Sequence, residues 1–425
     1  MTNDTPDPID AGIRRYRSAE ATVRILGPDG PLAGHAVTVG QRTHAFRFGC
    51  TGFEQIELAN AELDDAATER AERAAADWLD LYNFATLPFY WGRFEPVRGR
   101  PDTRRLRAAA RWFVDRGVAV KGHPLCWHSV GADWLLELTD DEIAEAQLAR
   151  IRRDVADFTG LIDSWDVINE VVIMPIFAKY DNGVSRMARK LGRVGIVRAT
   201  FDAARETNPG ATLLLNDFDM SADYEHLIED CLEAGIRIDA LGLQSHMHQG
   251  YWGEAKTRDV LERFARFGLP IHFTESTLVS GQLMPPEIVD LNDFQVDAWP
   301  STPEGEARQA DEIVRHYRTL LAHPAVEAIT WWEIQDGGWL GAPTGLIRAD
   351  GTRKPAFEAL RGLIKGDWWL SPTPMVTDET GSIRFDGFLG DYVLSIGGDA
   401  VPFRVGAAGP AEIDVRVGHE SGRRD

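Results

Sequence analysis

The sequence has 425 residues, 44% hydrophobic and 26% charged, which is the composition of a folded chain with a substantial core. Its net charge of −21 disfavours nucleic acids and anionic membrane surfaces as partners. The start, MTNDTPDPID, lacks the basic and apolar regions of a signal peptide, and no run of about 18 apolar residues follows, so we expect a cytoplasmic protein without a membrane span.

The first predicted elements are strands within residues 21–40, ATVRILGPDGPLAGHAVTVG, which surround turn signals of Gly and Pro. We therefore predict an N-terminal β-strand extension over residues 1–45. Whether these strands pack with another part of the chain stays open at this point.

Residues 46–366 alternate short apolar runs with helical patterns. Helix 307–324, for example, is predicted from apolar residues at Ile313, Tyr317, Leu320 and Leu321. Strands buried on both faces read as continuous apolar runs, as in parallel sheets covered by helices. The eight runs are 46–53, 81–87, 118–127, 162–169, 212–217, 240–246, 271–275 and 328–334.

This alternation predicts the α/β class and a (β/α)8 TIM barrel as the catalytic domain. A doubly wound open sheet is the alternative. It would need a glycine-rich phosphate turn after its first strand, and FGCTGFEQ is not such a turn.

The C-terminal part, residues 371–425, contains GSIRFDGFLGDYVLSIGGDAVPFRV, a series of short strands with Gly-Asp turns. We predict a small β module here, with the N-terminal strands as possible members. Its aromatic residues Phe385, Phe388, Tyr392 and Phe403 are few and spaced as core residues. This favours a bracing role over carbohydrate binding.

Polar and aromatic side chains stand at the ends of the predicted barrel strands. Functional residues of barrel enzymes occupy the carboxyl ends of the strands. The residues at these ends are His123, Trp127, His128, Asn169, Glu170, Asn216, Asp217, Gln244, His246, Glu275 and Trp332. Together they predict a sugar-binding cleft.

Two of these strand ends carry a glutamate, Glu170 in WDVINE and Glu275 in HFTES. Glycoside hydrolysis uses two carboxyl groups, one protonated to assist the leaving oxygen and one ionised. Asn169 can hydrogen-bond a sugar 2-hydroxyl, and Gln244 and His246 can orient a carboxylate. Each glutamate taken alone would equally suit a structural salt bridge.

A metal site is a weaker interpretation of the histidines. His246 and His248 in SHMH, with His123 and His128, have no acidic ligand at familiar spacing. We expect no metal and no other cofactor.

Several motifs in order resemble glycoside hydrolase family 10, the retaining endo-β-1,4-xylanases, over about residues 47–362. They are KGHPLCWHS, WDVINE, LLLNDFD, LGLQSHMH, HFTES, TWWEIQDGGW and RKPAFEAL. The chain is similar to a divergent member of that family.

The resemblance implies a (β/α)8 barrel, retention and no cofactor. It makes Glu170 the acid/base and Glu275 the nucleophile, which His246 positions. It implies substrate-binding roles for the polar and aromatic residues His123, Trp127, Asn169, Gln244, His246, Trp332 and Trp339. We add Asn83 and Tyr90, which lie in the segment that grips the sugar in the family.

That segment, NFATLPFYWGRFEPVRG, departs from the family pattern. Leu87, Pro88, Phe89 and Tyr90 stand where the family usually has a Glu-Asn pair and a lysine. The expected substrate is β-1,4-linked xylan or xylo-oligosaccharide, cleaved by double displacement. The alternatives are another β-linked glycan or glycoconjugate, a non-catalytic sugar-binding barrel, and a metal-dependent hydrolase. The oligomeric state cannot be predicted.

Overall fold

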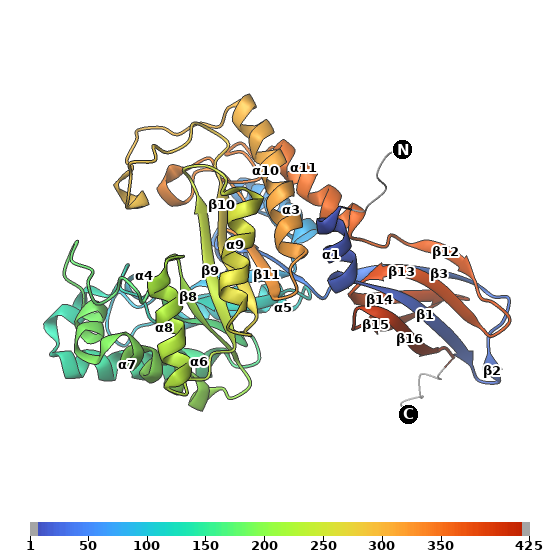
Figure 1. Cartoon of the computed structure of the whole chain (residues 1–425), viewed down its shortest axis with the longest axis horizontal. Helices are drawn as coiled ribbons and strands as arrows, with labels where there is room; N and C mark the ends of the chain where they lie inside the picture. The colour runs from blue at the N-terminus through green and yellow to red at the C-terminus, as the bar shows by residue number, and fades with distance from the viewer. Residues whose placement is uncertain (1–6, 419–425) are drawn as a thin grey trace. The chain divides into compact units, whose positions relative to one another are not determined.

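The computed structural model describes residues 7–418, which form two compact units. Of the described residues, the first unit comprises 7–47, Ala310–Pro324 and 355–418, and the second comprises Phe48–Gln309 and Ala325–Lys354. Figure 1 shows the barrel strands and helices in the blue-green to orange part of the chain, and the β module formed by blue and red strands.

Eight parallel strands close into a barrel, so the predicted (β/α)8 fold is confirmed. The strand order around the barrel is β10-β11-β4-β5-β6-β7-β8-β9. The strands are β4 (Arg47–Thr51), β5 (Phe84–Pro88), β6 (Ala119–His123), β7 (Ser164–Asn169), β8 (Thr212–Asp217), β9 (Ala240–Met247), β10 (Ile271–Leu278) and β11 (Val326–Trp331). Each of the eight predicted apolar runs overlaps one of them.

Helices alternate with these strands along the chain. The major ones are α3 (Asp65–Leu81), α5 (Thr103–Val114), α6 (Asp140–Phe158), α7 (Gly183–Thr207), α8 (Ala222–Glu233), α9 (Gly253–Ala265), α10 (Pro303–Leu321) and α11 (Pro355–Gly362). Shorter pieces are α2 (Gln55–Ala59), α4 (Trp91–Phe94), η1 (Asp133–Glu137), η2 (Leu291–Asp293), η3 (Trp339–Gly341) and the π-helical turn η4 (Leu363–Asp367).

Local sequence signals explain several of these boundaries. Thr139 and Glu142 form a capping box at the start of α6, which satisfies backbone donors that a helix leaves free. Gly117 follows α5 with a φ of 75°, a conformation that glycine adopts at no steric cost. In β6, a Cβ on Gly122 would lie 2.1 Å from the Trp165 ring, so only glycine lets β7 pack here.

The β module consists of two four-stranded sheets. The first sheet contains β1 (Ser18–Gly27) between β13 (Ser382–Phe388) and β16 (Gly409–Arg416), and β2 (Gly30–Pro31) pairs with β1. The second has the order β12 (Thr373–Val376), β3 (Ala36–His44), β14 (Gly390–Ile396) and β15 (Asp399–Val405). The N-terminal strands therefore do join the C-terminal ones. Helix α1 (Pro8–Arg17) precedes β1.

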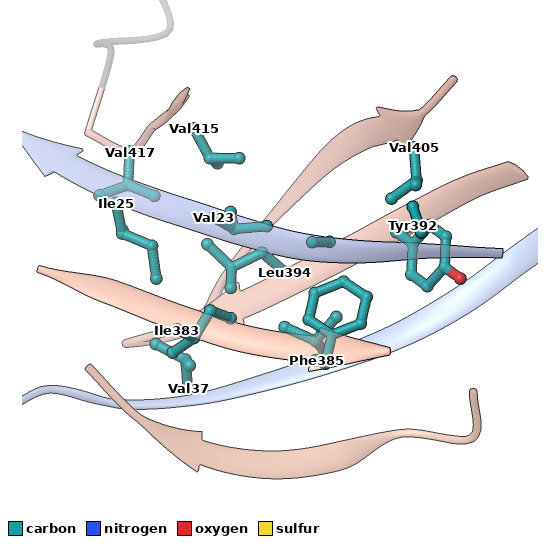
Figure 2. Close-up of a cluster of buried hydrophobic side chains, with 13 residues drawn as sticks. Val23, Ile25, Val37, Ile383, Phe385, Tyr392, Leu394, Val405, Val415 and Val417 are labelled. Carbon is teal, nitrogen blue, oxygen red and sulfur yellow. The ribbon is translucent and has the colours of Figure 1, made fainter. Parts of the chain in front are cut away.

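A separate hydrophobic core holds the β module together. Figure 2 shows side chains of β1, β13 and β14 pointing toward one another, among them Val23, Phe385 and Leu394. Val23, Tyr392 and Leu394 have no exposed surface, and Phe403 packs against this core at its edge. The prediction that these aromatic residues are core residues is confirmed for Phe385 and Tyr392.

Within residues 7–418, every helix is too short or too polar to cross a bilayer.

Candidate active site

The carboxyl ends of the barrel strands bring most of the predicted site residues together. His123 and Asn169 are the last residues of β6 and β7, and Glu170 follows β7 directly. Gln244 and His246 lie in the second half of β9, next to Glu275 in β10. Glu275 is only 5% exposed. Two carboxyl groups from β7 and β10 therefore share one enclosed site.

Glu170 is held by neutral hydrogen-bond donors. Trp127 Nε1 donates to Oε2 at 2.7 Å, and Asn169 Nδ2 and Gln244 Nε2 donate to Oε1 at 3.1 and 3.3 Å. The backbone of Glu170 has a φ of 58°, which is uncommon for a residue with a side chain. Such outliers are often kept at functional sites.

Burial, and after it the nearby charge of Glu275, raise the pKa of Glu170 to about 8. The Trp127 and Gln244 hydrogen bonds oppose this shift without cancelling it. At neutral pH the Glu170 carboxyl group is therefore mostly protonated and can donate a proton.

Glu275 has the opposite protonation state. Burial works to raise its pKa, but His123, His246 and Lys121 outweigh burial, and the pKa falls below its ordinary value. His246 Nε2 lies 3.0 Å from Oε2, and His123 Nε2 lies 3.8 Å from Oε1. Glu275 is thus an ionised carboxylate across most of the pH range.

A chain of amides connects the two glutamates. Asn216 Nδ2, at the end of β8, donates to Asn169 Oδ1 at 2.6 Å and to Glu275 Oε1 at 3.1 Å. Gln244 Nε2 donates to the same Asn169 oxygen at 3.1 Å. A Cβ at Gly242 would lie 2.3 Å from Asn216 Oδ1, so this glycine makes room for the amide. The sequence pattern predicts Asn216 at a strand end but not its hydrogen bonds to the other side chains.

A buried ion pair supports His123. Asp166 Oδ2 lies 2.7 Å from Lys121 Nζ and 2.8 Å from His123 Nδ1, and all three residues are almost fully buried. Burial would raise the pKa of Asp166, but Lys121 and His123 lower it below its ordinary value. Lys121 and Asp166 were missed because each lies inside an apolar run.

The predicted aromatic residues surround the carboxylates. The Tyr90 ring lies 5.7 Å from the His123 ring and 5.6 Å from the Trp127 ring. Trp332 packs edge-on against His123 at 5.3 Å, and Trp339 lies 4.6 Å from the His246 ring. Flat aromatic faces of this kind suit the apolar faces of sugar rings.

Asn83 does not reach this site. It precedes the first residue of β5 and therefore lies at the amino end of the barrel, opposite to Glu170 and Glu275. Its Oδ1 accepts a hydrogen bond of 2.9 Å from the backbone N of Phe48, so its side chain joins β4 to β5. The geometry corrects its expected substrate-binding role to a structural one.

The histidines do not form a metal site in the part of the chain that the structure describes, where no group of three or more His, Cys, Asp or Glu side chains converges. His128 packs against Phe177 at 4.4 Å, and His248 packs against Trp339 at 5.1 Å.

The site contains one protonated and one ionised glutamate, surrounded by aromatic rings, at the C-terminal ends of the (β/α)8 barrel strands. This combination defines the class of barrel glycoside hydrolases. The sequence model of glycosyl hydrolase family 10 matches residues 89–362, and the chain belongs to this family.

Curated relatives include endo-1,4-β-xylanase B of Thermotoga neapolitana, which is 27% identical over 65% of this chain and 78% of that protein. An endo-1,4-β-xylanase/feruloyl esterase of Xylanibacter ruminicola is 25% identical over 61% of this chain, and the match spans 39% of that protein's length. Among solved structures, xylanase 10B of Thermotoga petrophila in complex with xylobiose has a TM-score of 0.61 at 22% identity, covering 76% of this chain and 95% of that one. This last similarity concerns the fold.

Proposed function

We propose that this protein is a retaining glycoside hydrolase that cleaves β-1,4-linked xylan or xylo-oligosaccharides by double displacement. Glu275 attacks the anomeric carbon, and Glu170 protonates the leaving oxygen and then activates water for the second step. The observation that carries this proposal is the opposite pKa shift of the two glutamates, because the reaction begins with one acid and one carboxylate.

The neighbouring groups have roles in this reaction. His246 and His123 keep Glu275 ionised, and the amide of Asn216 fixes its second oxygen. Asn169 is oriented by Asn216 and Gln244, so its Nδ2 can reach a sugar 2-hydroxyl beside Glu170. Hydrogen bonds to that hydroxyl strengthen in the transition state.

One observation favours a second candidate, the same chemistry on a different β-linked glycan or glycoconjugate. Phe89 is completely buried and packs against Phe94, Phe158 and Trp165, and Leu87 is also completely buried. These positions therefore hold core residues instead of charged groups that bind hydroxyls. The Tyr90 ring, in contrast, lies beside the rings of His123 and Trp127.

The test is hydrolysis of 4-nitrophenyl β-xyloside, β-xylobioside, β-glucoside, β-cellobioside and α-arabinoside, with the Glu275→Ala protein as the control. We expect turnover of the xylobioside and its loss in the control. Turnover of another glycoside alone would favour the second candidate. Activity that survives in a folded Glu275→Ala protein would contradict the assigned nucleophile.

Glu170→Ala separates the acid role from a general loss of activity. A nitrophenolate leaves without protonation, whereas a sugar leaving group needs an acid. We therefore expect a loss of about 10²–10⁴-fold on xylo-oligosaccharides and a much smaller loss in the first step on aryl glycosides. Equal losses on both would contradict the acid role.

A further inference from the structure

Glu333 is an unusual residue two positions after the end of the eighth barrel strand, β11. It follows Trp332 at the carboxyl end of β11 and has a φ of 70°, in the left-handed region that favours glycine. A residue with a side chain is held in this region only where its surroundings require it. The contacts of the carboxylate indicate what the side chain contributes.

The Glu333 carboxylate binds the start of the next loop. Its Oε2 accepts a hydrogen bond of 2.6 Å from the backbone N of Trp339, and its own backbone N donates to Thr51 Oγ1 at 3.1 Å. A Cβ on Gly338 would lie 1.8 Å from the same Oε2. The carboxylate therefore rests directly on Gly338, and the loop at Trp339 is built around it.

Trp339 links this loop to the histidine beside Glu275. Its ring lies 4.6 Å from the His246 ring and 5.1 Å from the His248 ring, and its Nε1 donates to Asn292 Oδ1 at 3.2 Å. His246 Nε2 then lies 3.0 Å from Glu275 Oε2. Contacts thus run without interruption from Glu333 through Trp339 and His246 to Glu275.

We propose that Glu333 is a positioning residue that, through Trp339, fixes the His246 ring against the nucleophile. It acts by holding the backbone of Trp339, and its Oε2 is occupied by that hydrogen bond. The inference rests on the proposed function, because it takes Glu275 as the nucleophile. It adds a positioning contact that the different protonation states of Glu170 and Glu275 do not by themselves require.

The main test is Glu333→Gly. Glycine relieves the strain of the left-handed backbone, so thermal stability should be kept or raised. Because the carboxylate is also removed, kcat on 4-nitrophenyl β-xylobioside should fall about tenfold or more with little change in KM.

The control is Ala61→Gly, because Ala61 also has a positive φ, 54°, and lies on an exposed turn after α2. It should match the stability change and leave kcat unchanged. Glu333→Gln, which keeps an oxygen acceptor, should recover part of kcat.

A substrate-free readout separates this inference from the proposed function. The ring NMR signal of His246, assigned by its loss in His246→Gln, should shift in Glu333→Gly and stay in place in Ala61→Gly. An unmoved signal overturns the inference, whichever glycoside the protein cleaves. A loss confined to KM also overturns it, because Glu333 would then act on sugar binding through Trp339 and not on the nucleophile. Inactivity of the wild type on the xylobioside together with a shifted signal would count against the substrate alone.

Gly338→Ala provides a second, independent test. Its new Cβ must displace the Glu333 carboxylate, so it should lower kcat in the wild-type background. In the Glu333→Gly background that carboxylate is absent, and the same change should have a much smaller effect. Equal effects in the two backgrounds would contradict the coupling.

Discussion

Glu170 and Glu275 differ in protonation because of the charges around them, since burial acts on both in the same direction. The pKa of Glu275 is lowered despite burial by the nearby charges of His123, His246 and Lys121. Glu170 receives only neutral donors, and burial, Glu275 and Asp217 raise its pKa. A negative nucleophile beside a neutral acid is the state from which the proposed reaction starts.

This arrangement predicts a bell-shaped dependence of kcat/KM on pH. Activity needs a protonated Glu170, so it should fall as the pH rises through about 8. It also needs an ionised Glu275, whose pKa lies below 4.5, so the acid side should fall only below that pH. Rates with xylo-oligosaccharides between pH 3 and 10 measure both limbs.

Asp217→Asn tests the origin of the basic limb. Asp217 is buried, its own pKa is raised by burial to about 7, and its charge raises the pKa of Glu170. Removing that charge should move the basic limb to lower pH and leave the acid limb in place. A basic limb that stays unchanged would mean that another group controls it.

Lys121 and Asp166 should contribute to the stability of the fold as well as to the charge of the active site. Both side chains are buried, and Lys121→Met would leave the Asp166 charge with His123 as its remaining close partner. Breaking a buried ion pair in this way costs about 3–5 kcal/mol. We expect a loss of this size in urea unfolding at pH 7. Lys121→Arg, which keeps the charge, should lose clearly less.

At the scale of elements, the eight strands and their polar ends were predictable because strand length and burial leave a local pattern in the sequence. Distances between strands leave no such pattern. The Asn216 amide fits beside Asn169 because Gly242, on the next strand, leaves space. The pairing of Lys121 with Asp166 across β6 and β7 is also a contact between strands.

Strand boundaries explain the misplacement of Asn83. The predicted run 81–87 overlaps β5, which spans Phe84–Pro88, so Asn83 falls before the strand, at the amino end of the barrel. The motif resemblance could place Asn83 near a strand and could not tell which end it would occupy. One or two residues at a boundary decide whether a side chain faces the site.

Packing within the β module allows a direct test at the same scale. Leu394 in β14 is fully buried in the core between the two sheets, whereas Val376 in β12 is 66% exposed. Leu394→Ala should destabilise the protein by about 2–5 kcal/mol through lost burial and a cavity. Val376→Ala should change the free energy of unfolding by at most about 0.5 kcal/mol. Similar losses in both would contradict the assigned core.

At the scale of the whole molecule, the two ends of the chain build one sandwich. Strand β1 pairs antiparallel with β13 and parallel with β16, and β3 pairs with β12 and β14. Every one of these pairings joins residues before 45 to residues after 372. Local patterns predict such strands individually but not their partners, so the sequence left open whether the N-terminal strands join the module.

This topology predicts that the N-terminal strands cannot remain folded without the C-terminal segment. A chain that ends at residue 370 keeps β1 and β3 but removes β12 to β16, which exposes the hydrogen-bonding edges of both strands and apolar residues such as Val23 and Val39. Unpaired edges with apolar side chains promote aggregation. We expect the truncated chain to aggregate in sedimentation experiments at concentrations where the full chain stays dispersed. Adding residues 371–425 as a separate peptide should restore at least part of the dispersed fraction, because it returns the missing strands. A truncated chain that stays dispersed and keeps the thermal transition of the full chain would contradict the view that β1 and β3 depend on these partners.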